Sequence, residues 1–242
     1  MFIFKLVFII IYCYMESTNT SQGWYEKRKE LWEDKNATIK EMVGWEEINL
    51  PDIKCSNELV SGLIYTKQLV PNSALDCGSG IGRVSKHVLV NYFKEIDLFE
   101  QNEKFVEKSK EELSSFTNVR SIQQCSLQLF EFNNRKYDLI WIQWCLENLE
   151  DEDLDLFISK CYNGLNDNGI VIVKENFFYP TDEGPYKGKD YNYSDEDYSK
   201  QRKDIFYINL FMKHKFKIIK HFLNPNYPSK IIPLIVYVLT KE

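Results

Sequence analysis

The sequence predicts an α/β fold in one domain, on three observations. Short and almost wholly apolar segments recur along the chain, and amphipathic segments with helical periodicity separate them. The 242 residues are enough for one sizeable domain with a full core. Hydrophobic residues make up 44% and charged residues 27% of the chain, which is ordinary for a globular protein.

The N-terminal residues stand apart from this domain. Residues 2–14 are apolar except for one lysine, but a membrane span needs about 20 residues. Met15 opens a polar stretch typical of an ordinary start, so the apolar segment is either a misassigned start or a hydrophobic anchor. We assign residues 1–21 to an extension and 22–242 to the domain, and expect membrane association only if residues 1–14 are genuinely expressed.

Two helices are expected before the first strand. Residues 22–36 place tryptophans among charges, which indicates an amphipathic helix. Residues 37–55 predict an irregular connection. Ser56 is the expected N-cap of a second helix, which ends before Pro71.

From there, strands and helices are expected to alternate. Fully apolar strands separated by helices predict a mostly parallel, Rossmann-like sheet covered on both faces, and the last two strands predict a hairpin. The sheet should therefore contain seven strands, with one C-terminal antiparallel strand. Strands are expected at residues 74–77, 95–99, 119–125, 137–144, 170–173, 216–222 and 231–239, and helices at 82–93, 102–115, 150–165 and 197–213.

Residues 180–197 are the least regular stretch of the chain. They are polar and contain two prolines and two glycines. They form either a surface insertion or a lid over a substrate, because long loops without a role are uncommon. The segment follows the carboxyl end of a strand, which is where ligands bind to open α/β sheets.

A glycine-rich turn, LDCGSGIGR at residues 75–83, follows the first of the alternating strands. Gly78 and Gly80 belong to a G-x-G-x-G spacing, unlike the G-x-G-x-x-G of nicotinamide-binding folds, and such a turn before a helix N-terminus suits a carboxylate. Asp76 can meet an amino group, and Glu100, at the end of the next strand, can accept ribose hydroxyls. These groups predict S-adenosylmethionine as cofactor, with S-adenosylhomocysteine as its product.

Three motifs together resemble the protein α-N-methyltransferases, which methylate the α-amine of proteins beginning X-Pro-Lys or X-Pro-Arg. They are LDCGSGIGR, YDLIWIQW at residues 137–144 and GIVIVKEN at residues 169–176. The first is common to class I methyltransferases, whereas the other two are more specific. The resemblance covers about residues 24–242, and it implies a class I methyltransferase fold and protein N-termini as partners.

The resemblance also implies roles for individual residues. Arg83, paired with Gly78, is expected to reach the methionine carboxylate. The remaining cofactor contacts that it implies are Glu100, Gln101, Asn102, Leu127, Gln128 and Gln143.

On the acceptor side, the resemblance implies that Trp32 and Trp144 form the walls of the substrate pocket. Asn176 would hold the α-amine. Asp197 would take its proton, with Asp195 and Asp190 as competing candidates. Asn148 and Asp195 are the further substrate contacts expected here.

The sequence also departs from the family pattern. Asn148 stands where the family often has His, Trp45 replaces Tyr and Glu175 replaces Asp. These departures bear on the preferred substrate more than on the type of reaction. Two alternative functions therefore stay open: a small-molecule methyltransferase, and a non-catalytic, cofactor-binding partner of an active paralogue.

Charge and cysteine content exclude other classes. The net charge of −6 argues against a general nucleic-acid binder, which needs a basic face. The six cysteines form no C-x-x-C pair and no cluster with zinc spacing, so we expect no metal site. Such cysteines suit a reducing compartment, here the cytoplasm or the nucleus.

Overall fold

The computed structural model describes residues 23–178, 190–194, 198–225, 227, 231 and 233–242. The apolar segment at residues 1–14 lies outside the described residues. Within them, no helix has both the length and the apolar character that crossing a membrane requires.

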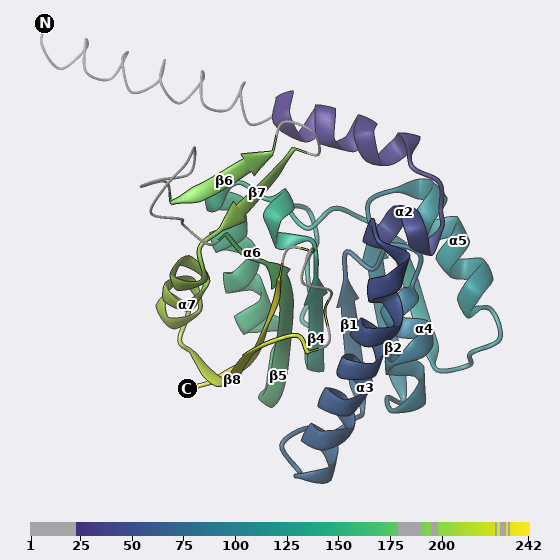
Figure 1. The fold of residues 1–242 in the computed structure, drawn as a ribbon. Coiled ribbons are helices and arrows are strands. Elements are labelled where there is room, and N and C mark those ends of the chain that lie inside the picture. Colours follow the sequence, from purple (N-terminus) through teal and green to yellow (C-terminus); the bar gives the residue numbers. More distant parts are fainter. Residues whose placement is uncertain (1–22, 179–189, 195–197, 226, 228–230, 232) are drawn as a thin grey trace, which may run out of the picture.

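A seven-stranded sheet with the order β3-β2-β1-β4-β5-β9-β8 forms the centre of the protein (Figure 1). Only β9 runs antiparallel to its two neighbours, and the other pairs are parallel. The expected seven-stranded sheet with a C-terminal antiparallel strand is therefore confirmed. The strands are β1 (Ser73–Cys77), β2 (Glu95–Glu100), β3 (Val119–Gln124), β4 (Tyr137–Gln143), β5 (Leu165–Asn176), β8 (Phe216–Leu223) and β9 (Leu234–Lys241).

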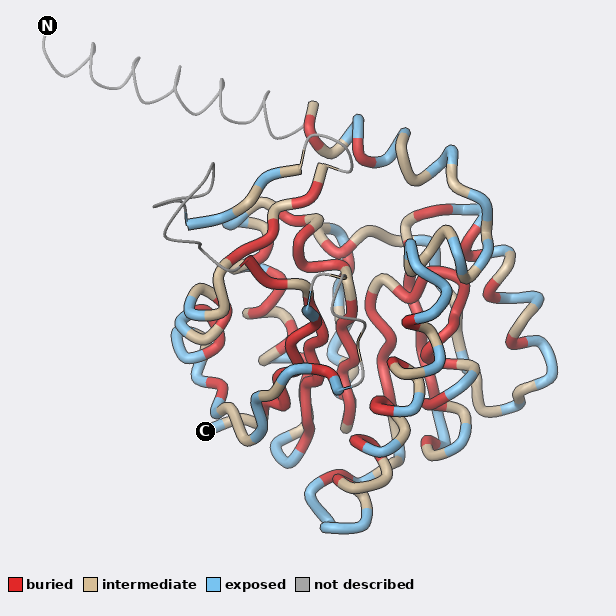
Figure 2. Tube along the Cα trace, viewed as in Figure 1, coloured by how far each residue is buried: buried red, intermediate tan, exposed pale blue. Residues whose placement is uncertain are grey.

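Helices cover both faces of the sheet. Alternate strand residues point to opposite faces, so the central strands contribute to two separate apolar cores. One core packs against α6 (Asp151–Gly164) and α7 (Asp204–Lys213). The other packs against α3 (Asn49–Tyr65), α4 (Arg83–His87) and the end of α5 (Glu103–Leu113). Figure 2 shows the buried strands between helices whose outer faces are exposed.

An N-terminal helix at residues 23–34 lies across the carboxyl ends of the strands (Figure 1). At one end, the Tyr25 hydroxyl donates to Asp153 Oδ2 at 2.5 Å and accepts from the backbone N–H of Glu150 at 2.9 Å. At the other end, Asn102 Nδ2 donates to the carbonyl oxygen of Trp32 at 2.6 Å. The helix is thus tied to α6 and to the start of α5.

The expected irregular connection at residues 37–55 is wrong. The chain forms α2 (Ile39–Val43), the 3-10 turn η1 (Glu46–Ile48) and then α3, which begins seven residues before Ser56. Pro51 lies in the first turn of α3, where its missing N–H breaks no helical hydrogen bond. Ser56 is therefore no N-cap, and its hydroxyl donates to the carbonyl oxygen of Asp52 at 2.8 Å inside the helix.

The expected helix at residues 82–93 is shorter than predicted. α4 ends at His87, and the 3-10 turn η2 (Leu89–Asn91) follows. Val88, between them, leaves the helical region with φ −125° and ψ −67°. Three β-branched valines at residues 84, 88 and 90 lower the helix propensity of this segment.

The expected helix at residues 197–213 begins too early, because α7 starts only at Asp204. Ser199–Arg202 form β7, which pairs antiparallel with β6 (Tyr191–Ser194), so part of the expected irregular loop is a hairpin. The Phe178 N–H donates to the Arg202 carbonyl oxygen at 2.9 Å, so the two ends of the segment that contains this hairpin are held together. Arg202, only 1% exposed, also donates to the carbonyl oxygens of Leu146 and Leu149 and pairs with Asp151.

Candidate active site

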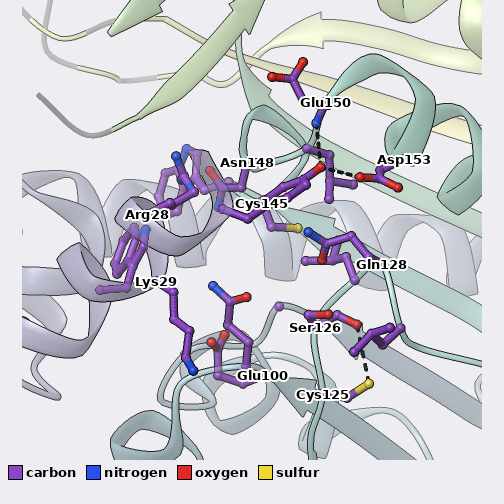
Figure 3. Close-up of a pocket in the computed structure, with 18 of the residues that line it drawn as sticks. Arg28, Lys29, Glu100, Cys125, Ser126, Gln128, Cys145, Asn148, Glu150 and Asp153 are labelled. Carbon is purple, nitrogen blue, oxygen red and sulfur yellow. Dashed lines mark hydrogen bonds between the residues drawn. The ribbon is translucent and has the colours of Figure 1, made fainter. Parts of the chain in front are cut away.

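A cavity of about 960 Å³ lies between the N-terminal helix, the β1–α4 loop and the carboxyl ends of β2 and β4. Arg28 and Lys29 reach it from the N-terminal helix on one side, and Ser126 and Gln128 lie on the other (Figure 3). Its wall contains five acidic and two basic side chains, so it favours cationic ligands. The acids are Glu26, Glu100, Glu150, Glu152 and Asp153.

The β1–α4 loop lets its backbone approach a ligand closely. Gly78 and Gly80 have φ values of +61° and +57°, which side-chain-bearing residues rarely adopt. A Cβ at Gly78 would lie 3.0 Å from the Cβ of Cys145, across the cavity wall. A Cβ at Gly80 would lie 2.2 Å from Cε of Met42, so Met42 of α2 packs against the loop.

Glu100 connects this loop to α5. One carboxylate oxygen accepts from the Gly80 N–H at 3.0 Å and the other accepts from the Asn102 N–H at 2.9 Å. Burial raises the pKa of Glu100, against these backbone donors, which lower it. A carboxylate offers about four lone-pair directions, so the group can still accept bonds from the cavity that it lines.

Asn102 serves the structure in two ways. Its side-chain oxygen caps α5 by accepting from the Lys104 N–H at 2.9 Å, and its amide holds Trp32, as described above. The N-cap residue thus joins the N-terminal helix to the end of β2. Asn102 does not itself line the cavity.

Trp144 follows β4 in a strained conformation. Its φ is +54°, which is rare for a bulky residue, and its N–H donates to the Lys174 carbonyl oxygen at 3.0 Å. Its ring lines the cavity and lies 5.2 Å from the guanidinium carbon of Arg83. Backbone strain of this kind is common at functional sites.

Two further cavity residues have unsatisfied polar atoms. The indole nitrogen of Trp32 and the side-chain oxygen of Asn148 are buried without a hydrogen-bond partner among the described residues. An unpaired buried polar atom is costly, so a ligand that bonds to these atoms would remove that cost. The Trp32 nitrogen is a donor and the Asn148 oxygen is an acceptor, so the pair matches the carbonyl and N–H groups of a peptide backbone.

A second, fully buried cluster lies behind the loop. The Asp52 carboxylate on α3 accepts from Arg83 Nη2 at 2.7 Å and from Gln143 Nε2 at 2.9 Å through one oxygen, and the other oxygen binds Lys174 Nζ. Asp52 and Lys174 are both 0% exposed. Sequence reasoning missed Asp52, because the residue was assigned to an irregular connection.

Asp76 lies at the end of β1. Its carboxylate accepts from the Ser85 hydroxyl at 2.7 Å, and burial raises its pKa to about 6. Asp76 does not line this cavity. Its expected contact with an amino group stays a prediction.

The end of β5 carries a buried acid and a half-buried amide side by side. The Glu175 carboxylate accepts from the backbone N–H groups of Leu146 at 2.8 Å and Asn176 at 3.2 Å, and burial raises its pKa to about 7. Glu175 therefore fixes the 3-10 turn η3 (Leu146–Asn148) against β5. The Asn176 side chain is half-buried and makes no hydrogen bond to a described residue, so its amide can bind a ligand.

The structure brings most predicted site residues to this end of the sheet. Those that line the cavity are Trp32, Gly78, Glu100, Gln101, Leu127, Gln128, Trp144 and Asn148. Predicted residues that do not line it are Asp76, Gly80, Arg83, Asn102, Gln143 and Asn176. Asp195 and Asp197 lie outside the described residues. Asp190 is exposed and pairs with Lys203 at 2.9 Å.

Sequence reasoning missed several cavity residues. Tyr25, Met42 and Cys145 line it, together with the acids at the start of α6. Tyr25 and Met42 precede the first strand, and nothing in their spacing indicates a position over the cavity. Cys145 directly follows the WIQW motif, and this adjacency is the one signal that could have identified it.

Comparisons with known proteins agree with this geometry. Residues 20–240 match a family described as AdoMet dependent proline di-methyltransferase. Alpha N-terminal protein methyltransferase 1 from Dictyostelium discoideum is 33% identical over 226 residues, which are 90% of this chain and 80% of that protein. N-terminal Xaa-Pro-Lys N-methyltransferase 1 from Bos taurus is 36% identical over 165 residues, which are 66% of this chain and 74% of that protein.

A solved structure shows the same fold. A SAM-dependent methyltransferase from Leishmania major superposes with a TM-score of 0.80 at 30% identity. The match covers 90% of this chain and 83% of that chain. The likeness therefore extends beyond the strands to most of the elements around the cavity.

Proposed function

Because this chain belongs to the family of AdoMet-dependent proline dimethyltransferases, we propose that it methylates the α-amino group of proteins that begin with X-Pro-Lys. X-Pro-Arg is a second proposed substrate, since arginine carries the same charge at the third position. One observation carries the proposal: a single cavity is lined by Gly78 and Glu100 and also by Trp32, Trp144 and Asn148. Groups suited to a nucleoside and groups suited to a peptide thus line the same cavity.

The donor side fits S-adenosylmethionine. Glu100 has acceptor capacity for ribose hydroxyls, Leu127 and Gln128 offer an apolar and an amide contact for a base, and Gly78 allows close backbone approach. Arg83 lies directly after the loop and can pair with a carboxylate. When bound, the cofactor supplies a methyl group activated by its positive sulfonium.

The acceptor side fits a cationic peptide with a proline. Trp32 and Trp144 offer aromatic surface to the rigid, apolar proline ring, which loses little entropy on binding. The excess of acidic side chains attracts the α-ammonium and the basic third residue. Because the sulfonium is a good leaving group, the main task of the chain is to align the amine with the methyl group.

The amine must also lose a proton before it reacts. A free α-amine has a pKa of about 7.7–8.0, so most of it is protonated at neutral pH. We propose that Asn176 holds the amine through its side-chain oxygen and that Asp197 accepts the proton directly or through water. Asn148, unlike the histidine frequent at this position, cannot take up a proton, which leaves this step to a carboxylate.

We also propose a reducing compartment, the cytoplasm or the nucleus, as the place of action. The five cysteines at residues 55, 77, 125, 145 and 161 are free thiols in the structure. Free buried thiols are typical of proteins from reducing compartments.

The decisive experiment uses labelled S-adenosylmethionine and three acceptors: a peptide beginning Ser-Pro-Lys, its Nα-acetylated form and ethanolamine. Transfer to the first alone is expected. Transfer to ethanolamine but not to the peptide would make the protein a small-molecule methyltransferase. Binding of the cofactor without transfer to any acceptor would make it a non-catalytic partner.

A site variant tests the assigned residue. Asn176→Ala should lower turnover at least ~10-fold, because one positioned hydrogen bond to the reacting group is lost, while the affinity for S-adenosylhomocysteine stays within about twofold. Asn91→Ala, on η2 before the start of β2, is the matched control. Unchanged turnover of Asn176→Ala would remove Asn176 from the reaction.

A further inference from the structure

The buried acid Asp52 occupies an unusual position for a helix residue. It is 0% exposed in the first turn of α3, and its carboxylate contacts side chains from three other elements. These are Arg83 on α4, Gln143 at the end of β4 and Lys174 near the end of β5. One carboxylate thus joins three segments that carry predicted site residues.

The contacts fix the orientation of both Arg83 and Gln143. The same Asp52 oxygen accepts from both side chains, at 2.7 and 2.9 Å. Arg83 Nη1 also donates to Asn49 Oδ1 at 3.1 Å, and Gln143 Oε1 accepts from the Trp141 indole at 3.1 Å. Arg83 and Gln143 are each held by two hydrogen bonds, so neither side chain can rotate without breaking at least one of them.

The charges in the cluster do not balance. Burial alone would raise the pKa of Asp52, but the charges of Lys174 and Arg83 outweigh it and lower the pKa, so the carboxylate stays ionised. One anion is shared by two cations, of which Lys174 is wholly enclosed. Arg83 is therefore only partly compensated, and within the described part of the chain three of its five N–H donors make no hydrogen bond and remain for another anion.

We infer that Asp52 is a positioning residue for cofactor binding, which holds Arg83 toward the carboxylate of S-adenosylmethionine and locks Gln143 beside it. This inference rests on the proposed function, because it assumes that the ligand carries a carboxylate. Asp52 itself acts only through the two side chains. The Lys174 ammonium neutralises Asp52 from the side of the sheet, where it donates to Asp52 and to the Ser56 hydroxyl.

The test compares two ligands by isothermal titration calorimetry. S-adenosylhomocysteine carries the amino-acid carboxylate, whereas 5′-methylthioadenosine has the same nucleoside and thioether without it. Asp52→Asn should weaken S-adenosylhomocysteine at least ~10-fold, because charge-assisted bonds at Arg83 lose their alignment. The affinity for 5′-methylthioadenosine should stay within about twofold, because that ligand makes no use of Arg83.

Two further variants separate positioning from simple stability. Asp52→Asn leaves two buried cations unpaired and is strongly destabilising, so Asp52→Asn/Lys174→Met restores the original charge count. This double variant should recover thermal stability but not the affinity for S-adenosylhomocysteine. Asp97→Asn is the matched control, because Asp97 on β2 is also buried and shared by two cations, Arg120 and Arg135.

The outcomes are distinct. Equal weakening of both ligands, or recovered S-adenosylhomocysteine affinity in the double variant, would show that Asp52 is merely structural and overturn the inference. Unchanged S-adenosylhomocysteine affinity in Asp52→Asn would overturn it as well. Absence of S-adenosylhomocysteine binding to the unaltered protein would instead overturn the proposed function, and the inference with it.

Discussion

Replacing Tyr25 by Phe removes a single hydroxyl from the junction between the N-terminal helix and α6. That hydroxyl donates to Asp153 Oδ2 at 2.5 Å and accepts from the Glu150 N–H at 2.9 Å. Burial raises the pKa of Tyr25, so the group remains a protonated donor at physiological pH. The ring itself stays, and with it the packing against Trp24.

The size of the effect follows from the two bonds. A bond to a neutral group contributes about 1 kcal/mol and one to a charged group about 1.5–3 kcal/mol. Both partners are part-buried, and water can replace some of what is lost, so a loss of ~2 kcal/mol in docking free energy is expected. This corresponds to a roughly 30-fold larger population in which the helix has left the cavity.

Hydrogen exchange measured by mass spectrometry tests this estimate. The backbone amides of residues 23–34 should lose protection by roughly 30-fold in Tyr25→Phe, and S-adenosylhomocysteine should dissociate faster by a similar factor. Tyr65→Phe is the control, because Tyr65 is 88% exposed on α3. Unchanged protection of residues 23–34 would refute the idea that this hydroxyl holds the helix over the cavity.

Three further predictions concern the loop, the buried acid and the hairpin. Gly80→Ala should lower the free energy of unfolding by about 1–2 kcal/mol in urea titration, since φ is +57° there, and adding Met42→Ala should not restore it. Glu175 has a folded pKa of about 7, so the stability it contributes is complete below its ordinary pKa of 4.5 and is lost as the pH rises through 7. The free energy of unfolding of the unaltered protein relative to Glu175→Gln should therefore fall by about 3 kcal/mol between pH 4.5 and 8. A difference between the two proteins that does not change with pH would contradict the raised pKa. Arg202→Met should cost about 2–4 kcal/mol in urea, because several buried carbonyls lose their donor, whereas the surface variant Lys203→Met should cost under about 0.5 kcal/mol.

Much of the fold could be predicted from local patterns. The apolar runs around Ile140 and Val171 indicate central strands, because a strand covered on both faces is apolar throughout. The hairpin strand at Ser199–Arg202 escaped prediction for the opposite reason. It pairs with one short strand outside the main sheet, so it carries no apolar alternation, and a polar segment before α7 looks like part of the helix.

The site residues likewise divide into those that the sequence predicts and those that it does not. Gly78 follows β1 and Glu100 ends β2, and the carboxyl ends of these parallel neighbours meet at one edge of the sheet, so the proximity of the two residues can be expected from the chain order alone. Asp52 could not be found by such reasoning. Its partner Lys174 is 122 residues away, and the choice of a buried partner depends on how α3 packs, which no local pattern encodes. Resemblance to a family supplied Trp32 and Asn148, for which spacing alone predicts only a helix and a turn.

The backbone hydrogen bond that joins the two ends of the segment after β5 has a consequence for how this enzyme can be altered. Phe178 and Arg202 are joined by a backbone hydrogen bond of 2.9 Å, so the two ends of the segment between them are adjacent. The entropic cost of joining two fixed ends grows only slowly with the number of residues between them. We therefore expect that the segment between them can be lengthened or shortened at a small cost in stability, provided that β7 keeps the buried residues Ser199 and Gln201, while the methyl-donor half of the enzyme stays intact.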